Sequence, residues 1–167
     1  SAEPLLGADR PRIGQRAGRL LKFLEILASG EDDSRREPAR LFDLWLNAQR
    51  RAAQGRYDDA VARAYRLLEW SAQWLLRTRA GIDTSDVPPE RVPGDITLRP
   101  GREGRLQAGL FEAWALVAGL LEGPSATFAR EQSRVMLDHL KARNASILAH
   151  GFEPIDREAW ERFSAWL

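Results

Sequence analysis

The sequence contains no cysteine among its 167 residues and only two histidines, His139 and His150. The absence of cysteine excludes disulfide bonds, thiolate metal sites and cysteine nucleophiles. Two imidazoles are too few for a dedicated zinc site, so we expect no metal and no cofactor. No apolar run approaches the roughly 20 residues of a membrane-spanning helix, because Glu112 and Glu122 interrupt the most apolar segment. We therefore expect no membrane association.

Lysine is nearly absent as well, since Lys22 and Lys141 are the only two and every other basic residue is arginine. We attribute this bias to the codon usage of a high-GC genome rather than to function. The net charge of +1 gives no general sign of a nucleic-acid binder. No signal peptide is recognisable, and we expect a cytoplasmic protein. The start Ser1-Ala2-Glu3 lacks an initiator methionine, which suggests a piece of a longer protein.

Apolar spacing and helix breakers predict an all-α fold, a bundle of five to six helices. The second helix is expected to have Pro38 in its first turn and to stop at Gly55. Three further helices are expected over residues 13–29, 57–79 and 106–121, and Gly81 closes the second of these. Another helix is expected to be capped by Ser125 or Thr127 and to run to His150, and a last one to be capped by Asp156.

Residues 82–104 are rich in proline and glycine, which predicts a long loop with at most a short strand over 95–98. A loop of this length in a compact domain is often functional or mobile. We expect two parts in the chain. Residues 1–36 form an N-terminal lead and helix, and residues 37–167 form the helical effector domain.

Two arginine–histidine pairs occur within the fifth predicted helix. Arg143 and His150 are seven positions apart, so at about 100° per residue they lie roughly 20° apart on one face. Arg134 and His139 are five positions apart, or about 140°, and cannot share a face. Gly151 can adopt the left-handed conformation that ends a helix. The first pair alone could hold a phosphate and move a proton beside it.

The helix that begins at Tyr57 is a second segment of interest. Its Gly-x-Tyr-x-x-Ala turn also occurs in tetratricopeptide hairpins, but the 34-residue repeat of those proteins is absent. Arg66 and Glu69 are three positions apart, and a helix salt bridge explains them more simply than a ligand role. Trp70 and Trp74 are four apart, which could suit base stacking, although a core or interface position is the simpler interpretation.

Together these segments resemble the HEPN superfamily, an all-α group with many metal-independent ribonucleases. More narrowly, the chain looks like the C-terminal effector region of a CRISPR-associated family that has an N-terminal CARF ligand-sensing domain. The matching elements are Asn47-Ala48-x-Arg50-Arg51, Gly55-Arg56-Tyr57-Asp58-Asp59-Ala60-Val61 through Glu69, Gly81-Ile82-Asp83-Thr84-Ser85-Asp86-Val87, and Leu140-x-x-Arg143-Asn144-x-Ser146-Ile147-Leu148-Ala149-His150-Gly151-Phe152.

The resemblance implies a metal-independent endoribonuclease that acts on single-stranded RNA as a homodimer. In such enzymes the Arg-x(4–6)-His motifs of two protomers form one composite site. By that analogy Arg143 steadies the scissile phosphate, His150 is the general acid or base, and Asn144 orients either group. The RNA 2′-hydroxyl is the nucleophile and gives a 2′,3′-cyclic phosphate. Weaker substrate-binding candidates are Ser146, Tyr65, Arg66 and Glu69.

Two other interpretations remain open. The chain could be a non-catalytic HEPN module that dimerises or binds RNA with an idle motif. It could also be a plain helical scaffold, in which Arg143 is held in an intramolecular ion pair and RNA does not bind. The resemblance also implies a CARF sensor domain, which this sequence does not contain.

Overall fold

The computed structural model describes residues 21, 25, 33–144 and 154–167. The chain divides into two compact units, Ser1–Asp43 and Leu44–Leu167. The second unit contains every element that bears on the candidate site. Helices account for most of its residues, which confirms the predicted all-α class.

Helix α2 runs from Asp33 to Ala53 and contains Pro38 in its interior. The prediction that Pro38 occupies the first turn was therefore wrong by several residues. Proline at the sixth helical position lacks the hydrogen bond to the carbonyl four residues earlier and crowds that carbonyl, so local sequence does not predict a helix that continues across it. At the other end Gly55 adopts φ +73°, and its amide N donates to the carbonyl of Ala52 over 2.9 Å. Gly55 ends the helix as predicted.

Helix α3, Tyr57–Leu75, begins as the sequence predicts, with Asp58 and Asp59 in its first turn. Carboxylates there interact favourably with the positive end of the helix dipole. The helical path continues as a π-helical turn, η1 (Leu76–Ala80), and ends at Gly81 in the left-handed conformation with φ 65°. The buried face of α3 consists of Ala60, Val61, Ala64, Tyr65, Leu68 and Ala72.

The segment between Gly81 and α4 folds against the core instead of standing free. It contains two 3₁₀ turns, η2 (Pro89–Arg91) and η3 (Arg102–Gly104), and a short ribbon of β1 (Arg99–Pro100) with β2 (Leu106–Gln107). Buried side chains anchor it at Ile82, Val87 and Leu98.

The predictions for this segment were wrong at two boundaries. The strand lies at 99–100 rather than within 95–98, and the next helix does not start at Leu106. Leu106 belongs to the ribbon, and its carbonyl accepts a hydrogen bond from Val87 N at 2.9 Å. A helical Leu106 would direct that carbonyl along the helix axis and lose this partner.

Helix α4 spans Leu110–Leu120, α5 spans Pro124–Asn144 and α6 spans Arg157–Trp166. The proposed caps Ser125 and Thr127 were wrong, because α5 already begins at Pro124, after a turn at Gly123 with φ +84°. Proline suits the first helical position, where its missing N–H has no intrahelical partner. The predicted cap of α6 is confirmed, since Asp156 Oδ1 accepts from Ala159 N at 2.8 Å. The predicted continuation of α5 to His150 falls outside the described residues.

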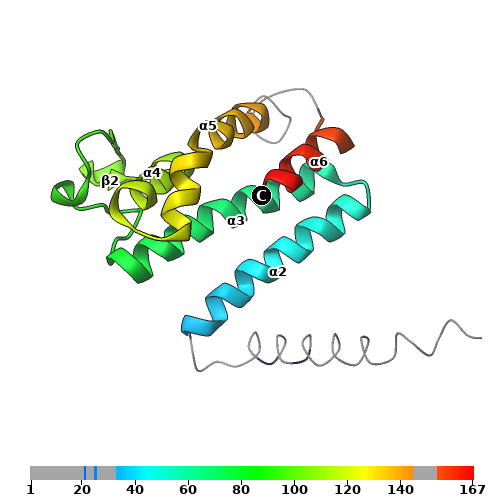
Figure 1. The fold of residues 1–167 in the computed structure, drawn as a ribbon, viewed down its shortest axis with the longest axis horizontal. Coiled ribbons are helices and arrows are strands. Elements are labelled where there is room, and N and C mark those ends of the chain that lie inside the picture. The colour runs from blue at the N-terminus through cyan, green and yellow to red at the C-terminus, as the bar shows by residue number, and fades with distance from the viewer. Residues whose placement is uncertain (1–20, 22–24, 26–32, 145–153) are drawn as a thin grey trace, which may run out of the picture. The chain divides into compact units, whose positions relative to one another are not determined.

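Helix α3 is the central element of the second unit, and both α4 and α6 contact it (Figure 1). The buried Trp114 of α4 donates its indole N–H to the carbonyl of Leu68 at 3.1 Å. On α6, Phe163 stacks on Tyr65 of α3 with ring centroids 5.1 Å apart. Trp114 and Trp160 are core residues, whereas Trp70 and Trp74 are half-buried. Within the described ranges, no helix is both long and apolar enough to cross a membrane.

Candidate functional site

Helix α5 carries a seven-residue stripe that leads directly to the arginine of the predicted motif. Ala129 and Met136 are seven positions apart, and both are buried, with 2% and 1% of their surfaces exposed. Arg143 is the next member of this series, and its backbone lies in the last turn of α5. Seven residues rotate a helix by about 700°, so Arg143 takes the same face position as Met136 to within ~20°. The motif therefore begins on the face that packs inward earlier in the helix.

The second half of α5 is held by aromatic contacts with α6. The His139 ring lies 5.0 Å from the ring of Phe163 and 4.9 Å from that of Trp166. Trp166 Nε1 of α6 also donates a hydrogen bond to Gln132 Oε1 of α5 at 2.8 Å. Ring packing and a hydrogen bond at two levels fix both the rotation and the axial position of α5. The backbone that carries Arg143 is thus positioned by α6.

The chain that follows the motif is anchored on the first turn of α3. Ile155 N donates to Asp58 Oδ1 at 3.1 Å, across 97 positions of sequence. Arg157 Nε donates to the hydroxyl oxygen of Tyr57 at 3.0 Å, and this bond raises the Arg157 pKa above its ordinary value. Residues 145–153 therefore join two anchored ends, the last turn of α5 and the start of α6. Asp58 and Tyr57 acquire positioning roles from this arrangement.

The predicted catalytic residues fall at and beyond the end of α5. Arg143 and Asn144 are consecutive residues in its last turn, where the structure describes their backbone. Ser146 and His150 lie outside the described residues. Their roles, and the pairing of Arg143 with His150, stay predictions.

The three candidates on α3 have different surroundings. The side chain of Tyr65 is buried, with 7% of its surface exposed, and stacks on Phe163. Arg66 and Glu69 form the helix salt bridge that the sequence suggested, with Arg66 Nη1 2.7 Å from Glu69 Oε2. Arg66 also lies 5.9 Å from the ring of Trp70. The structure therefore brings Arg66 and Glu69 to each other and gives Tyr65 a packing role.

Three arginines near the start of α3 share one carboxylate, that of Asp59. Asp59 lies 2.6 Å from Arg56, 2.9 Å from Arg63 and 4.0 Å from Arg51. The hydrogen bond from Arg63 lowers the pKa of Asp59 most, and the charges of Arg63, Arg56 and Arg51 lower it further. This cluster organises the α2–α3 turn, and Asp59 offsets only part of the positive charge of the three arginines.

The other histidine of α5, His139, is a packed side chain. Burial is the main cause that lowers its pKa below the usual 6.5, opposed by Asp138 and aided by Arg162. Arg134 is exposed, whereas His139 faces the rings of α6, in agreement with the helical register that separates the two. Within the described ranges, no three His, Cys, Asp or Glu side chains converge as metal ligands would.

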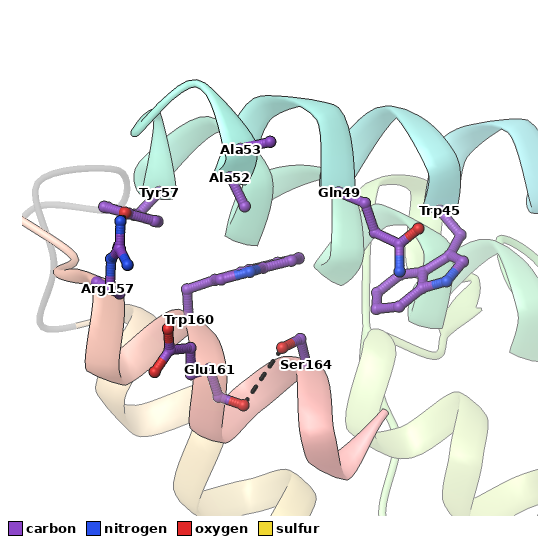
Figure 2. Close-up of a pocket in the computed structure, with 9 residues that line it drawn as sticks. All are labelled: Trp45, Gln49, Ala52, Ala53, Tyr57, Arg157, Trp160, Glu161 and Ser164. Carbon is purple, nitrogen blue, oxygen red and sulfur yellow. Dashed lines mark hydrogen bonds between the residues drawn. The ribbon is translucent and has the colours of Figure 1, made fainter. Parts of the chain in front are cut away.

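A pocket of about 370 Å³ opens between α2 and α6, and the sequence reasoning did not foresee it (Figure 2). Aromatic rings and polar groups alternate around it, from Trp45, Gln49, Ala52, Ala53, Tyr57, Arg157, Trp160, Glu161 and Ser164. We call it the α2–α6 pocket. The signal available beforehand was the four-residue spacing of Trp45 and Gln49, which places both on one face of α2. The pocket residues on α6 are distant in sequence, and residue spacing does not predict that α6 packs beside α2.

No curated protein and no solved structure matches this chain. One family model, described as the Csm6 HEPN domain, matches residues 32–167, which is most of the sequence. The match includes the Tyr57 helix, the ribbon segment and the Arg143-to-His150 stretch, the same elements that carry the resemblance to HEPN proteins. The chain therefore belongs to the Csm6 HEPN domain family, and it is a CRISPR-associated domain of the HEPN type.

Proposed function

We propose that this domain is a metal-independent endoribonuclease that cleaves single-stranded RNA at a composite site formed by two protomers. The observation that carries the proposal is the α5 stripe of Ala129, Met136 and Arg143. This stripe supports the proposal, because the backbone of Arg143 lies in the last turn of a helix that packs against α6. Membership of a CRISPR-associated HEPN family supports the same assignment.

The proposed chemistry needs only groups that the two protomers supply. The RNA 2′-oxygen attacks the adjacent phosphorus and forms a 2′-O–P bond while the bond to the 5′-oxygen breaks. One His150 takes the 2′-hydroxyl proton and an acid, the partner's His150 by symmetry, protonates the departing 5′-oxygen. Arg143 stabilises the charge that develops on the phosphate oxygens, and Asn144 orients the phosphate or the imidazole. The products are a 2′,3′-cyclic phosphate and a 5′-hydroxyl.

The weaker candidates receive supporting roles in this proposal. Ser146 lies between Arg143 and His150 in sequence and would bind substrate close to the phosphate. Arg66 and Glu69 would contribute to RNA binding as an exposed pair on α3, with Arg66 as the cationic member. Tyr65 would act through packing, since its ring is buried against Phe163.

The proposal also includes the organisation of the whole protein. Residues 37–167 form the effector domain, and residues 1–36 connect it to an N-terminal CARF sensor domain. The active form is a homodimer, and its place of action is the cytoplasm. We assign these points from the family resemblance and from the helical lead expected in the first residues.

The test compares Arg143→Ala and His150→Ala with the unchanged protein on single-stranded RNA in the presence of EDTA. Loss of a general acid or base typically slows a reaction by about 10²- to 10⁴-fold, and we expect a loss in this range for His150→Ala. Arg134→Ala is the matched control, because it removes an exposed arginine of the same helix outside the motif. The product should carry a 2′,3′-cyclic phosphate.

Cleavage that persists in both motif variants would refute the proposal. RNA binding without any cyclic-phosphate product, by a dimer of the full chain, would instead establish the non-catalytic HEPN module. The absence of RNA binding would leave the helical scaffold.

A further inference from the structure

We infer that the α2–α6 pocket binds one nucleobase of the RNA substrate, at a nucleotide near the cleaved bond. This inference rests on the proposed function and identifies a second contact of the same site. It assigns a role to Trp45, Gln49, Arg157 and Trp160, four residues that the Arg143–His150 motif does not include.

Two tryptophans form the apolar part of the pocket. The rings of Trp45 on α2 and Trp160 on α6 have centroids 6.1 Å apart and planes inclined by 32°. Figure 2 shows the Trp160 ring extending along the space between the two helices, with Trp45 at one end. Indole faces are the surfaces on which nucleobases stack in proteins that bind single strands.

The polar groups of the pocket are largely unused. Within the described part of the chain, neither the Gln49 amide nor the indole N–H of Trp45 or Trp160 makes a hydrogen bond. Trp160 is 7% exposed as a whole residue, and its Nε1 is not among the described buried polar atoms that lack a partner, so this donor is accessible to solvent. Arg157 uses its Nε for Tyr57, and its two terminal NH₂ groups have no hydrogen bond to described residues. A base edge offers the acceptors and donors that these groups lack.

The size of the pocket agrees with a single nucleoside. Its volume of about 370 Å³ lies near the lower limit of small-molecule sites, roughly 300–1,000 Å³. A base with its sugar fits such a volume. At one end of the pocket Arg157 and Tyr57 lie side by side in Figure 2, so a guanidinium stands where the adjoining phosphate would lie.

The position of the pocket connects it to the motif. Arg157 follows His150 by only seven residues, a span of at most ~25 Å even for fully extended chain. The intervening chain returns to α3 at Asp58, the neighbour of Tyr57. A strand of RNA cleaved at His150 could therefore reach the pocket within a few nucleotides.

The surrounding arginines favour a base contact over a simple phosphate track. Arg56 and Arg63 are paired with Asp59, and Arg66 is paired with Glu69. On α6, Arg162 is paired with Glu158 at 2.6 Å. Among the described arginines of this region, Arg157 differs because its terminal NH₂ groups make no hydrogen bond to described residues and aromatic rings lie beside it.

The experiment uses the full chain and non-cleavable 2′-O-methyl single strands labelled for fluorescence anisotropy. Each strand lacks one base, with the abasic position moved along the sequence. Loss of one stacked base should weaken binding by about 5- to 150-fold at one position and little elsewhere. In the Gln49→Ala/Arg157→Gln double variant, the penalty for removing that same base should be smaller, because the base has already lost its polar contacts and keeps only the stacking on the tryptophans.

Arg162→Gln is the matched control, since it removes an exposed arginine of α6 that does not line the pocket. Both altered pocket side chains are exposed, and the melting temperature of each variant checks that the fold is retained. A uniform abasic profile, or a penalty at the sensitive position that is as large in the double variant as in the unchanged protein, overturns the inference. If the unchanged protein cleaves RNA to a cyclic phosphate in that case, the proposed function stands without the pocket.

Discussion

The Asp58 carboxylate should stabilise the fold by fixing the chain that follows the motif. In Asp58→Ala, Ile155 N loses an acceptor at 3.1 Å in a half-buried setting, and α3 loses an acidic residue from its first turn. A hydrogen bond to a charged group contributes about 1.5–3 kcal/mol, less where water has access, and the helix N-terminus adds roughly 0.3–1 kcal/mol. We therefore expect the free energy of unfolding to fall by about 2 kcal/mol.

Asp58→Asn is the matched variant, because it keeps a side-chain oxygen for Ile155 N and removes only the charge. It should recover about half of the loss, since neutral hydrogen bonds contribute roughly 0.5–1.5 kcal/mol. Urea unfolding measures both variants, and the melting temperature of Asp58→Ala should fall by about 4–8 °C in a chain of this size. RNA cleavage should fall as well at temperatures where the variant is folded, because His150 lies on the chain that this bond anchors. An Asp58→Ala protein within about 0.5 kcal/mol of the unchanged protein would refute the anchoring argument.

Two further predictions concern α5. Arg130 donates to the carbonyls of Ala118 at 2.9 Å and Leu121 at 3.1 Å, which close the end of α4, so Arg130→Ala should cost about 1–2 kcal/mol in urea unfolding. Arg134→Ala, one turn further along, should change stability by less than about 0.5 kcal/mol, and equal effects of the two would contradict this capping role. His139 has a lowered pKa, so the unfolded chain binds more protons, and stability should decline as the pH falls below about 6.5 toward the folded-state pKa. His139→Gln should flatten this decline, and an unchanged pH profile would argue against it.

The helical elements were predictable wherever a local signal determined them. Gly55 and Gly81 end helices because only a residue without a side chain adopts their positive φ readily, and Asp156 caps α6 through its own carboxylate. These signals act over a few residues and can be seen in the sequence. The start of α2 was misplaced because a proline normally marks a helix start, whereas α2 continues for five residues before Pro38.

The errors between Gly81 and α4 have a different origin. Leu106 has the apolar spacing of a helix, but its carbonyl pairs with Val87, and Ala108 N donates to Thr84 at 2.9 Å. Such pairings depend on how two distant pieces of chain meet, which local periodicity does not encode. The same reason explains the pocket, since Trp45 and Trp160 are 115 positions apart in sequence. The spacing of Arg143 and His150 could be interpreted because both residues lie on one predicted helix. The catalytic role of this pair stays a prediction.

The contact between Ile155 and Asp58 also bears on the order in which the domain folds. Helices α4 and α5 are joined by a short turn at Gly123, so their contacts form between near neighbours of the chain. The docking of α6 on α3 instead closes a loop of 97 positions, which carries a larger entropic penalty and is expected late. The chain that bears His150 is bracketed at both ends only after that step. If the proposed nuclease activity holds, we expect it to be the last property that the folding domain acquires, after its helical content is complete.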